Sequence, residues 1–457
     1  MRSRLPKLLH PLCGRPMIAW SVAAANAAGA SRVIVVQGPG RELEAVLEDR
    51  VEFAIQHQAR GTADAVRAAA PLFADAGTVI VVNGDHPLVS PDTIRGLAAA
   101  HERSGAAATI ATAVLDDPTG FGRIVRGPDG TVERVVETKA AGDASEFELR
   151  IREVNTGIYA FEPGELLSAL DRVQSHNAQG EQYLPDVALI LREDERSVLA
   201  QEISDPGSTL GVNDRAQLAQ ARALAQRRIQ ERLMLAGVTI VDPASTDIDV
   251  GVEVAADAVI APFSSLHGAT RVGASSTIGP ASTLIDTTVG EESRVIHSYV
   301  VEAAVGDRVS VGPFAYLRPG TVMREGSKAG TFVELKNTDV GPRSKVPHLS
   351  YIGDAEIGED TNLGASTITA NYDGSRKHRT RIGDRVKTSV DTTLVAPVTV
   401  GDEAYTAAGS VITKDVPEGA LGVARARQEN IEGYADRRKE RDQEEPRHPP
   451  HLNSDQR

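Results

Sequence analysis

The sequence predicts an α/β domain of Rossmann-like, doubly wound topology, then a long connecting helix and a parallel β-helix built from six-residue repeats. Three observations lead to this prediction: alternating β-branched and Ala-rich stretches, one long stretch without Gly or Pro, and a change of hydrophobic period after Pro243. At 457 residues the chain is also longer than one hydrophobic core supports, so at least two domains are expected.

Residues 16–210 alternate short β-branched runs with helical stretches. The runs 32–37 and 78–83 are predicted to be buried strands, and the Ala-rich stretches 61–75 and 91–104 to be helices. Such alternation is typical of a sheet covered by helices on both faces. The α/β domain is therefore expected to span residues 1–212.

A single long helix is expected to follow. From Asp214 to about Leu235 the sequence is rich in Ala, Gln, Arg and Leu and contains neither Gly nor Pro. Gly237 then supplies a residue that commonly ends a helix. We expect residues 213–237 to form a helix that connects two domains.

After Pro243 aliphatic residues recur at every sixth position. The recurring residues are Ile248, Val254, Ile260, Leu266, Val272, Ile278 and Leu284, then Val305, Val311 and Leu317, then Ile382, Leu394, Val400 and Ile412. A six-residue repeat with an inward aliphatic side chain is typical of a parallel β-helix, in which each coil buries its apolar face against its neighbours. A β-sandwich would instead alternate every second residue. We assign residues 238–435 to the β-helix.

Two stretches interrupt this period, and the last residues lose it. Insertions are predicted at about 318–345 and at 371–381, where a solenoid tolerates them on its outer edges. From 436 to 457 the chain is rich in charged residues, Pro and His and poor in aliphatic residues, so a disordered tail is expected.

The net charge and the cysteine content limit which partners and which cellular compartment are expected for this protein. With 63 acidic and 49 basic residues the formal net charge is −14. The chain therefore lacks the overall positive charge with which proteins bind nucleic acid or an anionic membrane. No run of about 18 apolar residues is present. The one cysteine, Cys13, allows no internal disulfide and suits a reducing compartment. The sequence therefore predicts a cytoplasmic protein that binds neither nucleic acid nor membrane.

Three features of the first domain suit the binding of a nucleoside triphosphate and a divalent metal. Lys7 lies on a Pro-stiffened loop, where a lysine can grip phosphates, although most loop lysines are merely solvated. Asp85 follows a predicted strand, at the sheet edge where such domains bind ligands and Mg²⁺ finds carboxylates; a turn-capping role is the alternative. Gly61 and Thr62 begin a predicted helix whose N-terminus offers amides and a hydroxyl.

An ordered set of motifs makes the first domain resemble the uridylyltransferase half of the GlmU family. The motifs are Leu5-Pro-Lys-x-Leu, Gln56-x4-Gly-Thr62, Asn83-Gly-Asp85, Gly120-Phe-Gly-Arg-Ile124, Val136-Glu-x-Lys139, Glu153-x-Asn-Thr-Gly157 and Gly211-Val-Asn213. The resemblance implies UTP and Mg²⁺ as ligands. It implies nucleotide contacts for Lys7, Gln56, Gly61, Thr62 and Gly84, sugar contacts for Gly122, Glu137 and Asn155, and Mg²⁺ ligation by Asp85 and Asn213, with Asn213 also at the nucleotide.

The second domain resembles the acetyltransferase half of the same family, a left-handed β-helix. The motifs are Arg318-Pro-Gly, Val333-Glu-Leu-Lys-Asn337, His348-Leu-Ser-Tyr-Ile-Gly-Asp354, Asn362-Leu-Gly-Ala365, Asn371-Tyr-Asp-Gly374 and Ala407-Ala-Gly-Ser410. By resemblance glucosamine 1-phosphate is bound by Arg318, Lys336, Tyr351 and Asn362, and acetyl-CoA by Ala365, Asn371, Tyr372, Lys377, Ala408 and Arg425.

His348 is the candidate general base for acetyl transfer. A base with a pKa near neutrality must take a proton from the attacking amine, and histidine suits this task. A lone histidine in a repeat protein is more often structural, but His348 lies within the family motif. At Ser389-Val390-Asp391 the chain departs from the Gly-Ser-Asp usual in the family, so the serine contact to the acetyl donor is left unassigned.

The resemblance implies a bifunctional enzyme that makes UDP-N-acetylglucosamine, by acetylating glucosamine 1-phosphate and then transferring a uridylyl group to N-acetylglucosamine 1-phosphate. Similar β-helices are trimeric acyltransferases, so a homotrimer is expected. Two rivals stay open: a γ-type carbonic anhydrase, which needs three histidines on zinc and which a zinc assay tests, and a non-enzymatic scaffold, which turnover of either reaction excludes.

The family's first strand and its Gly-x-Gly-Thr-Arg-Met loop are expected ahead of Lys7, and the sequence begins at what resembles the last residue of that loop. Because this loop offers amides and an arginine to a triphosphate, we expect the 457-residue chain to acetylate but to uridylylate poorly. Adding an upstream extension that carries the loop should restore uridylyl transfer, measured as pyrophosphate release at saturating UTP and Mg²⁺. Full activity without the extension would contradict this expectation.

Overall fold

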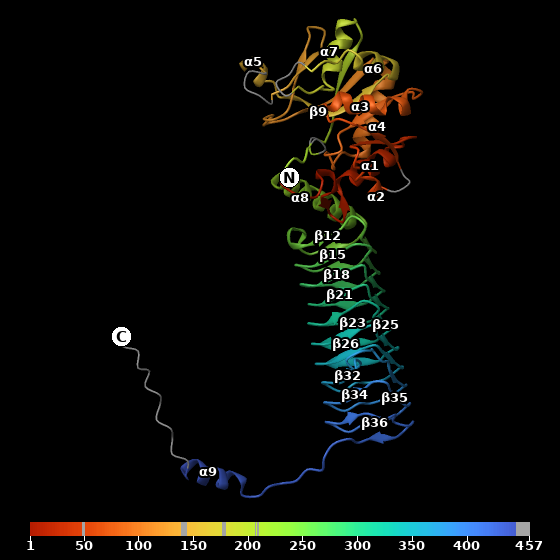
Figure 1. The fold of residues 1–457 in the computed structure, drawn as a ribbon, viewed down its shortest axis with the longest axis vertical. Coiled ribbons are helices and arrows are strands. Elements are labelled where there is room, and N and C mark those ends of the chain that lie inside the picture. The colour runs from red at the N-terminus through yellow and green to blue at the C-terminus, as the bar shows by residue number, and fades with distance from the viewer. Residues whose placement is uncertain (48–50, 139–143, 176–179, 206, 208–209, 445–457) are drawn as a thin grey trace, which may run out of the picture. The chain divides into compact units, whose positions relative to one another are not determined.

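A computed structural model describes residues 1–47, 51–138, 144–175, 180–205, 207 and 210–444. The chain divides into two compact units, residues 1–302 and 303–457. The first unit holds the α/β domain, a long helix and the first coils of a β-helix, and the second unit holds further coils (Figure 1).

The elements of the α/β domain alternate as the sequence predicts. Its helices are η1 (Lys7–Leu9), α1 (Met17–Ala28), α2 (Glu44–Leu47), α3 (Thr62–Phe73), α4 (Pro91–Ser104), α5 (Glu146–Leu149), α6 (Pro163–Leu170) and α7 (Asp186–Glu193). Its strands are β1 (Pro11–Leu12), β2 (Arg15–Pro16), β3 (Ile34–Gln37), β4 (Glu52–Ile55), β5 (Val79–Val82), β6 (Ala108–Val114), β7 (Arg123–Arg126), β8 (Val132–Val136), β9 (Glu153–Phe161) and β10 (Val198–Glu202).

Two sheets lie between layers of helices, which confirms the predicted fold class. One apolar core joins α3, α6 and α7 to one face of the larger sheet, and a second joins α1 and α4 to the other face. The larger sheet runs β10-β6-β9-β7-β8, with β5 also paired to β9, while β3 and β4 form a separate parallel pair. Among the described strands of this domain, β3 pairs with β4 and β6 pairs with β10 in parallel, whereas β5 is antiparallel to β9.

Local sequence explains where the helices begin and end. Ser90 caps α4 by accepting the amide of Thr93, Pro91 occupies the first turn, and Gly105 closes the helix in the left-handed region. The predicted connecting helix is α8 (Arg215–Leu235), whose N-cap Asp214 accepts the amide of Gln217. Among the described residues no helix is both long and apolar enough to cross a membrane.

The first unit then begins a left-handed β-helix. Its first strand, β11 (Thr239–Ile240), precedes η4 (Pro243–Ser245). The strands after η4 are β12 (Asp247–Ile248), β13 (Glu253–Val254), β14 (Val259–Ile260), β15 (Ser265–His267), β16 (Arg271–Val272), β17 (Thr277–Ile278), β18 (Thr283–Ile285), β19 (Thr288–Val289), β20 (Arg294–Val295) and β21 (Tyr299–Val301). They build three parallel sheets, β11-β14-β17-β20, β12-β15-β18-β21 and β13-β16-β19. All the predicted inward aliphatic residues of this unit are buried except Val254, which is half-buried.

The second unit continues the same pattern. Its strands are β22 (Ala304–Val305), β23 (Ser310–Val311), β24 (Tyr316–Leu317), β25 (Val322–Met323), β26 (Lys328–Thr331), β27 (Glu334–Lys336), β28 (Asp339–Val340), β29 (Lys345–His348), β30 (Tyr351–Gly353), β31 (Ala355–Ile357), β32 (Ile368–Ala370), β33 (Thr380–Ile382), β34 (Thr393–Val395), β35 (Val398–Val400), β36 (Tyr405–Thr406), β37 (Val411–Ile412) and β38 (Leu421–Gly422). Within it β23-β26-β29, β24-β27-β30-β32-β34-β37 and β22-β25-β28-β31-β33-β35 pair in parallel.

One predicted insertion is wrong and the other is confirmed. Residues 318–345 carry β25 to β28, which pair in register with the preceding coil, so no insertion interrupts the solenoid there. The inward positions are taken by Met323 and Ala329, which a search for branched aliphatic residues overlooks. Residues 371–379 do leave the strands, forming a loop with an isolated bridge between Tyr372 and Lys377.

The tail expected to be disordered from 436 to 457 begins instead with a helix. Residues Tyr434–Glu444 form α9, and the side chains of residues 434–443 are exposed. Pairs such as Asp436 and Lys439, one turn apart, favour a helix even where no apolar face is present. The remaining residues, 445–457, lie outside the described part of the chain.

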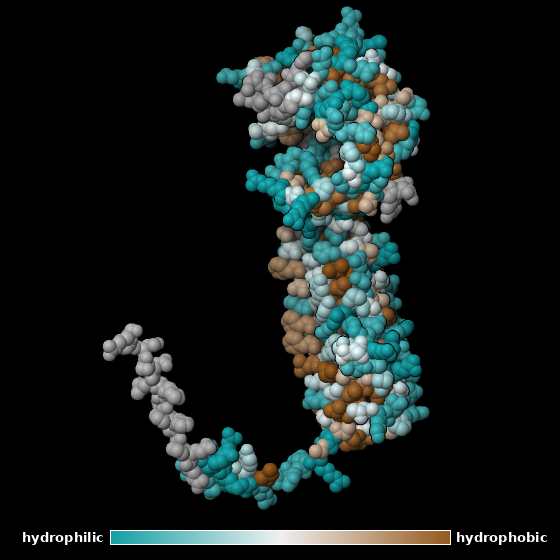
Figure 2. Space-filling model, viewed as in Figure 1, coloured by the Kyte–Doolittle hydropathy of each residue, from teal (hydrophilic) through white to brown (hydrophobic). Residues whose placement is uncertain are grey.

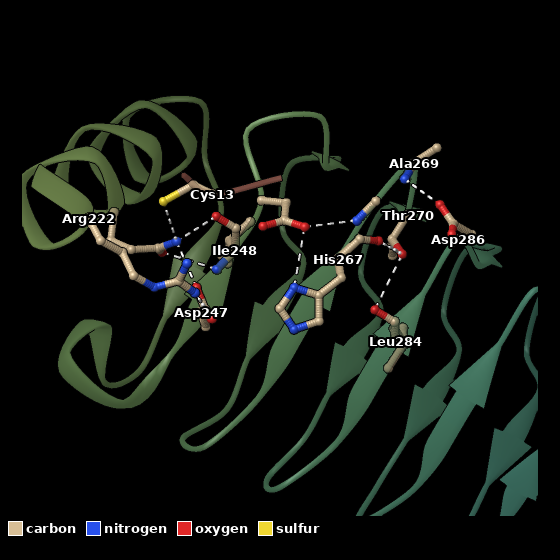
Figure 3. A network of polar contacts seen from close by, with 12 residues as sticks. Cys13, Arg222, Asp247, Ile248, His267, Ala269, Thr270, Leu284 and Asp286 are labelled. Atoms are coloured by element: carbon tan, nitrogen blue, oxygen red, sulfur yellow. Dashed lines mark hydrogen bonds and ion pairs between the residues drawn. The ribbon is translucent and has the colours of Figure 1, made fainter. Parts of the chain in front are cut away.

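A polar network joins helix α8 to the N-terminal segment and to the first coils of the β-helix (Figure 3). Gln226 donates from Nε2 to Asp247 Oδ1 at 2.7 Å and to the carbonyl of Ile248 at 2.8 Å, and it contacts Cys13 Sγ at 3.3 Å. Arg222 pairs with the same Asp247. Burial raises the pKa of the Cys13 thiol, so this cysteine fills space rather than reacting.

Asp249 and His267 extend this network along the coils. The Asp249 carboxylate accepts the amide of Gly268 at 3.0 Å and lies 3.3 Å from Nδ1 of His267. The hydrogen bond to Asp249 raises the pKa of His267 above its ordinary value. Burial alone would raise the pKa of Asp249, but its hydrogen bonds to His267 and to the Gly268 amide outweigh burial and lower it. The pair is therefore charged over a wider pH range than isolated groups.

Replacing His267 with Gln should remove stability in acid more than in base. Because the folded-state pKa of His267 is raised, its contribution is fully present below the ordinary value of 6.5 and is lost as pH rises through the folded-state pKa. With 31% of its side chain exposed, the contribution should be at most about 1 kcal/mol. Thermal unfolding at about pH 5.5 and about pH 8.5 measures it, with His57→Gln as the control. An equal loss at both pH values would contradict the ion pair.

Candidate active sites

The carboxylate that follows β5 lies within a cluster of polar groups. Val82 ends the strand, and the backbone turns through Asn83 and Gly84 to Asp85. Lys7 Nζ donates to Asp85 Oδ2 at 2.6 Å and to Asn213 Oδ1 at 2.8 Å. The amide of Val212 donates to the carbonyl of Asp85 at 2.9 Å, which fixes Asn213 beside the carboxylate. Three residues far apart in the sequence thus converge, as the motifs predicted.

His86 lies behind this cluster and sequence analysis did not single it out. Its ring is buried, its Nε2 lies 3.7 Å from Asp85 Oδ1, and desolvation lowers its pKa, so the ring is held neutral. Two glycines make room for it, because a Cβ at Gly211 would lie 3.0 Å from Nε2 and one at Gly157 would lie 3.4 Å from Cε1. The only signal in the sequence was the position of His86 next to Asp85.

Gln56, Gly61 and Thr62 meet at the start of α3. Gln56 donates from Nε2 to the carbonyl of Gly61 at 3.1 Å and to Asp64 at 2.9 Å, which orients its side chain. Gly61 adopts φ +116°, and a Cβ there would overlap the backbone of Gln182. The Thr62 hydroxyl accepts the amide of Leu184 at 2.9 Å rather than capping its own helix. The three residues form a rigid corner of the domain.

Gly122, Glu137 and Asn155 form a second group on the same sheet. The amide of Asn155 donates to the carbonyl of Gly122 at 2.9 Å, and a Cβ at Gly122 would lie 3.6 Å from Glu137 Oε1. Asn155 is buried, and its side chain both donates to the Tyr159 hydroxyl at 2.7 Å and accepts the amide of Gly157 at 3.0 Å. Because Val82 pairs with Ile158, this group lies at the end of β5 that carries Asp85.

The oxygen groups beside Lys7 suit a hard cation. Asp85 offers a carboxylate and Asn213 an amide oxygen, and both already accept from a positive charge. No group of three or more His, Cys, Asp or Glu suited to a metal occurs among the residues that the structure describes. A Mg²⁺ ion held there would need substrate phosphates and water to complete its shell, as is usual for this ion.

In the second unit a cluster of cations surrounds Asp354. Its carboxylate accepts Asn337 Nδ2 at 2.7 Å and Asn371 Nδ2 at 2.6 Å, and it lies 3.5 Å from Lys336 Nζ. Tyr351 reaches the same place, since a Cβ at Gly353 would collide with its hydroxyl and with Asn371 Nδ2. Asp354 is the last residue of the motif that begins at His348, and the sequence alone suggested no role for it. In the structure its carboxylate lies at the centre of this cluster.

The cluster carries excess positive charge. The neighbouring Lys336 ammonium lowers the pKa of Lys377, which comes from the loop 371–379. Arg318 adds a third cation, paired with Glu334 at 2.8 Å and 5.9 Å above the Tyr316 ring. Three cations beside two carboxylates, Asp354 and Glu334, leave excess positive charge, which favours an anionic ligand such as a sugar phosphate.

His348 lies in a column of residues that belong to successive coils. The carbonyl of His348 accepts the amide of Ser366, the carbonyl of Ala365 accepts the amide of Asp391, and the carbonyl of Val390 accepts the amide of Gly409. The residues His348, Ala365, Val390 and Ala408 therefore stack one above another. The exposed His348 and two predicted acetyl-CoA residues share one edge of the β-helix.

Comparison with known proteins places the chain in a family. Residues 1–147 match the family described as MobA-like NTP transferase domain. Over 96% of its length the chain is 48% identical to "Bifunctional protein GlmU" of Streptomyces avermitilis, covering 92% of that protein. The chain belongs to the GlmU family. The GlmU proteins of Mycolicibacterium vanbaalenii and Brevibacillus brevis are 49% and 48% identical over the same share of the chain, which covers 91% and 95% of them.

The remaining residues predicted from the GlmU family lie at the margins of these clusters. Asn362 is exposed and bridges Lys345 and Lys387 by backbone pairing, on a different sheet from Lys336 and Tyr351. Tyr372 is exposed on the loop, where its hydroxyl donates to the carbonyl of Gly374 at 2.6 Å. Arg425 is exposed beyond the last coil. Within one chain these residues do not complete an enclosed site.

Val390 lies within Ser389-Val390-Asp391, the stretch that departs from the Gly-Ser-Asp expected from the resemblance. Its side chain is 47% exposed and lies in the column between Ala365 and Ala408. The preceding Ser389 donates its amide to Thr406 and is half-buried, so it does not take the outward position. The outward position of the column between Ala365 and Ala408 therefore carries an isopropyl group and not the hydroxyl of Ser389.

Proposed function

We propose that this chain synthesises UDP-N-acetylglucosamine in two reactions at two separate sites. The second-unit cluster with His348 acetylates glucosamine 1-phosphate, and the Asp85 cluster uridylylates the N-acetylglucosamine 1-phosphate that results. The observation that carries the proposal is the similarity to GlmU proteins across 96% of the chain, which includes both clusters. Each cluster has the charge and donors that its reaction needs.

For acetyl transfer, the contacts support binding of the sugar phosphate by Lys336 and Arg318, beside Tyr351. Lys377, assigned to acetyl-CoA by resemblance, lies close to Lys336. The sugar amine attacks the thioester carbon of acetyl-CoA, its C–N bond forms, the C–S bond breaks and coenzyme A leaves as the thiol. His348 takes the proton that the amine loses, and this proton then passes to the departing thiolate. Acetyl-CoA would lie along the column of Ala365, Val390 and Ala408, near Asn371 and Tyr372.

For uridylyl transfer, an oxygen of the sugar phosphate attacks the α-phosphorus of UTP, and the bond to pyrophosphate breaks. Asp85 and Asn213 would hold Mg²⁺, which neutralises phosphate charge when bound. Lys7 supplies a second positive charge to the triphosphate, with Gln56, Gly61 and Gly84 near the nucleotide. Gly122, Glu137 and Asn155 would orient the sugar at the end of β5.

We further propose a homotrimer that acts in the cytoplasm. Apolar side chains gather along one edge of the β-helix (Figure 2). The exposed rings of Phe314 and Phe332 stack with centroids 5.4 Å apart, and the exposed Leu349 belongs to the next coil, since its amide donates to the carbonyl of Thr331. Leu349 directly follows His348. A second copy on this edge would cover the apolar column and enclose the site beside His348, since apolar edges of this kind commonly mark interfaces. The single cysteine suits a reducing compartment.

The test is to incubate the protein with glucosamine 1-phosphate, acetyl-CoA, UTP and Mg²⁺ and to follow thiol and pyrophosphate release together. Both should appear, and pyrophosphate should lag behind thiol because the acetylated sugar must form first. Release of neither product would overturn the proposed function.

Replacing His348 with Ala should lower thiol release about 10²- to 10⁴-fold, the usual contribution of a positioned general base. Pyrophosphate release from supplied N-acetylglucosamine 1-phosphate should be unchanged, because the uridylyl site does not use His348. Normal thiol release by the variant would make His348 a structural residue.

Replacing Asp85 with Ala should abolish Mg²⁺-dependent pyrophosphate release, because the metal would then be held only by a neutral amide and substrate. Thiol release should stay at the wild-type rate and serves as the folding control. A variant that still releases pyrophosphate normally would remove Asp85 from the metal site.

A further inference from the structure

The oxygen atoms proposed to hold Mg²⁺ are bridged by a cation that belongs to the chain. Lys7 Nζ lies 2.6 Å from Asp85 Oδ2 and 2.8 Å from Asn213 Oδ1. Lys7 is carried by η1, just before the β1–β2 hairpin, whereas Asp85 follows β5 and Asn213 precedes α8. One ammonium therefore links three segments of the domain through the two oxygens.

A metal ion and this ammonium cannot share the oxygen pair. Asn213 has a single amide oxygen, and the other oxygen of Asp85, Oδ1, lies 3.7 Å from His86 Nε2. An ion bound to Asn213 Oδ1 and to Asp85 Oδ2 would lie between the oxygens that Lys7 bridges. Two cations at that separation repel strongly, and Mg²⁺ also requires ligands at about 2.1 Å.

A triphosphate offers Lys7 another partner. The lysine side chain is flexible, and 35% of it is exposed, so its ammonium can turn away from the oxygen pair without breaking the core. A nucleoside triphosphate carries more negative charge than the pair of Asp85 and the neutral Asn213. Binding of the nucleotide would draw the ammonium to the phosphates and leave both oxygens to the metal.

We propose that Lys7 occupies the metal position between Asp85 and Asn213 until a nucleoside triphosphate draws it away, so that metal and nucleotide bind cooperatively. This inference rests on the proposed uridylyl site. It assigns Lys7 a second role, as a competitor of the free metal, in addition to its contact with phosphates. Because coupling is reciprocal, a metal bound to the pair would also favour the nucleotide.

The experiment is a titration with Mn²⁺ alone, a spin-active substitute for Mg²⁺, with the free ion followed by electron paramagnetic resonance. Lys7→Met keeps the length of the side chain and removes the charge, so it should bind Mn²⁺ about tenfold more tightly than wild type, within the usual range for coupled sites. Lys7→Arg keeps the cation and should bind as weakly as wild type. Lys414→Met removes an exposed lysine of the β-helix and is the matched control.

Lys7→Met combined with Asp85→Ala should lose the tight binding, which locates the ion at the oxygen pair. Affinities of Lys7→Met and wild type that agree within error would overturn the inference, as would equal tightening in Lys7→Arg or Lys414→Met. Uridylyl transfer by wild type is measured in parallel. If that reaction is absent the proposed function fails, whereas a wild type that turns over while Lys7→Met binds Mn²⁺ no more tightly fails the inference alone.

Discussion

The stacking of β-helix coils is the constraint on which the acetyl-transfer site depends. Every coil must turn an apolar side chain inward at fixed intervals, and Ile260, Leu266 and Leu284 are fully buried for this reason. Parallel pairing then places equivalent residues of successive coils directly above one another. His348 and Ala365 lie in one column because the repeat aligns them, although no side-chain bond holds them together. The side chains proposed to do the chemistry thus lie at outward positions of the β-helix, and the buried aliphatic side chains determine how its coils stack.

The first domain positions its groups differently, through strand ends and glycines. Asp85 is placed by the end of β5, and β9 runs antiparallel beside it to bring Asn155 to the same end. Gly157 has φ +75°, and a Cβ there would overlap Asn83 Nδ2, so the close approach of these strand ends requires glycine. Burial of His86 beneath Asp85 completes a site whose polar groups come from separate segments.

Much of this architecture was predictable because the repeat and the strand ends leave marks in the sequence. The period after Pro243 identified the inward residues, and α3, α4 and α8 lie within the stretches 61–75, 91–104 and 213–237 that were predicted to be helical. The interval 318–345 was misjudged, because Met323 and Ala329 fill inward positions without being branched. Asp354 and His86 escaped notice because their roles arise from contacts across coils and strands, which spacing along the chain does not reveal. The helix at 434–444 arises from local charge pairs rather than from packing.

We propose that one chain carries out two reactions in sequence. The mass of the final sugar nucleotide tests most directly whether both reactions occur. Purified protein is given glucosamine 1-phosphate and Mg²⁺ with acetyl-CoA, with UTP, or with both, and the products are identified by mass spectrometry. We expect N-acetylglucosamine 1-phosphate with acetyl-CoA alone and UDP-N-acetylglucosamine only when both donors are present. Formation of UDP-glucosamine in the absence of acetyl-CoA, or no acetylated product in its presence, would contradict the account.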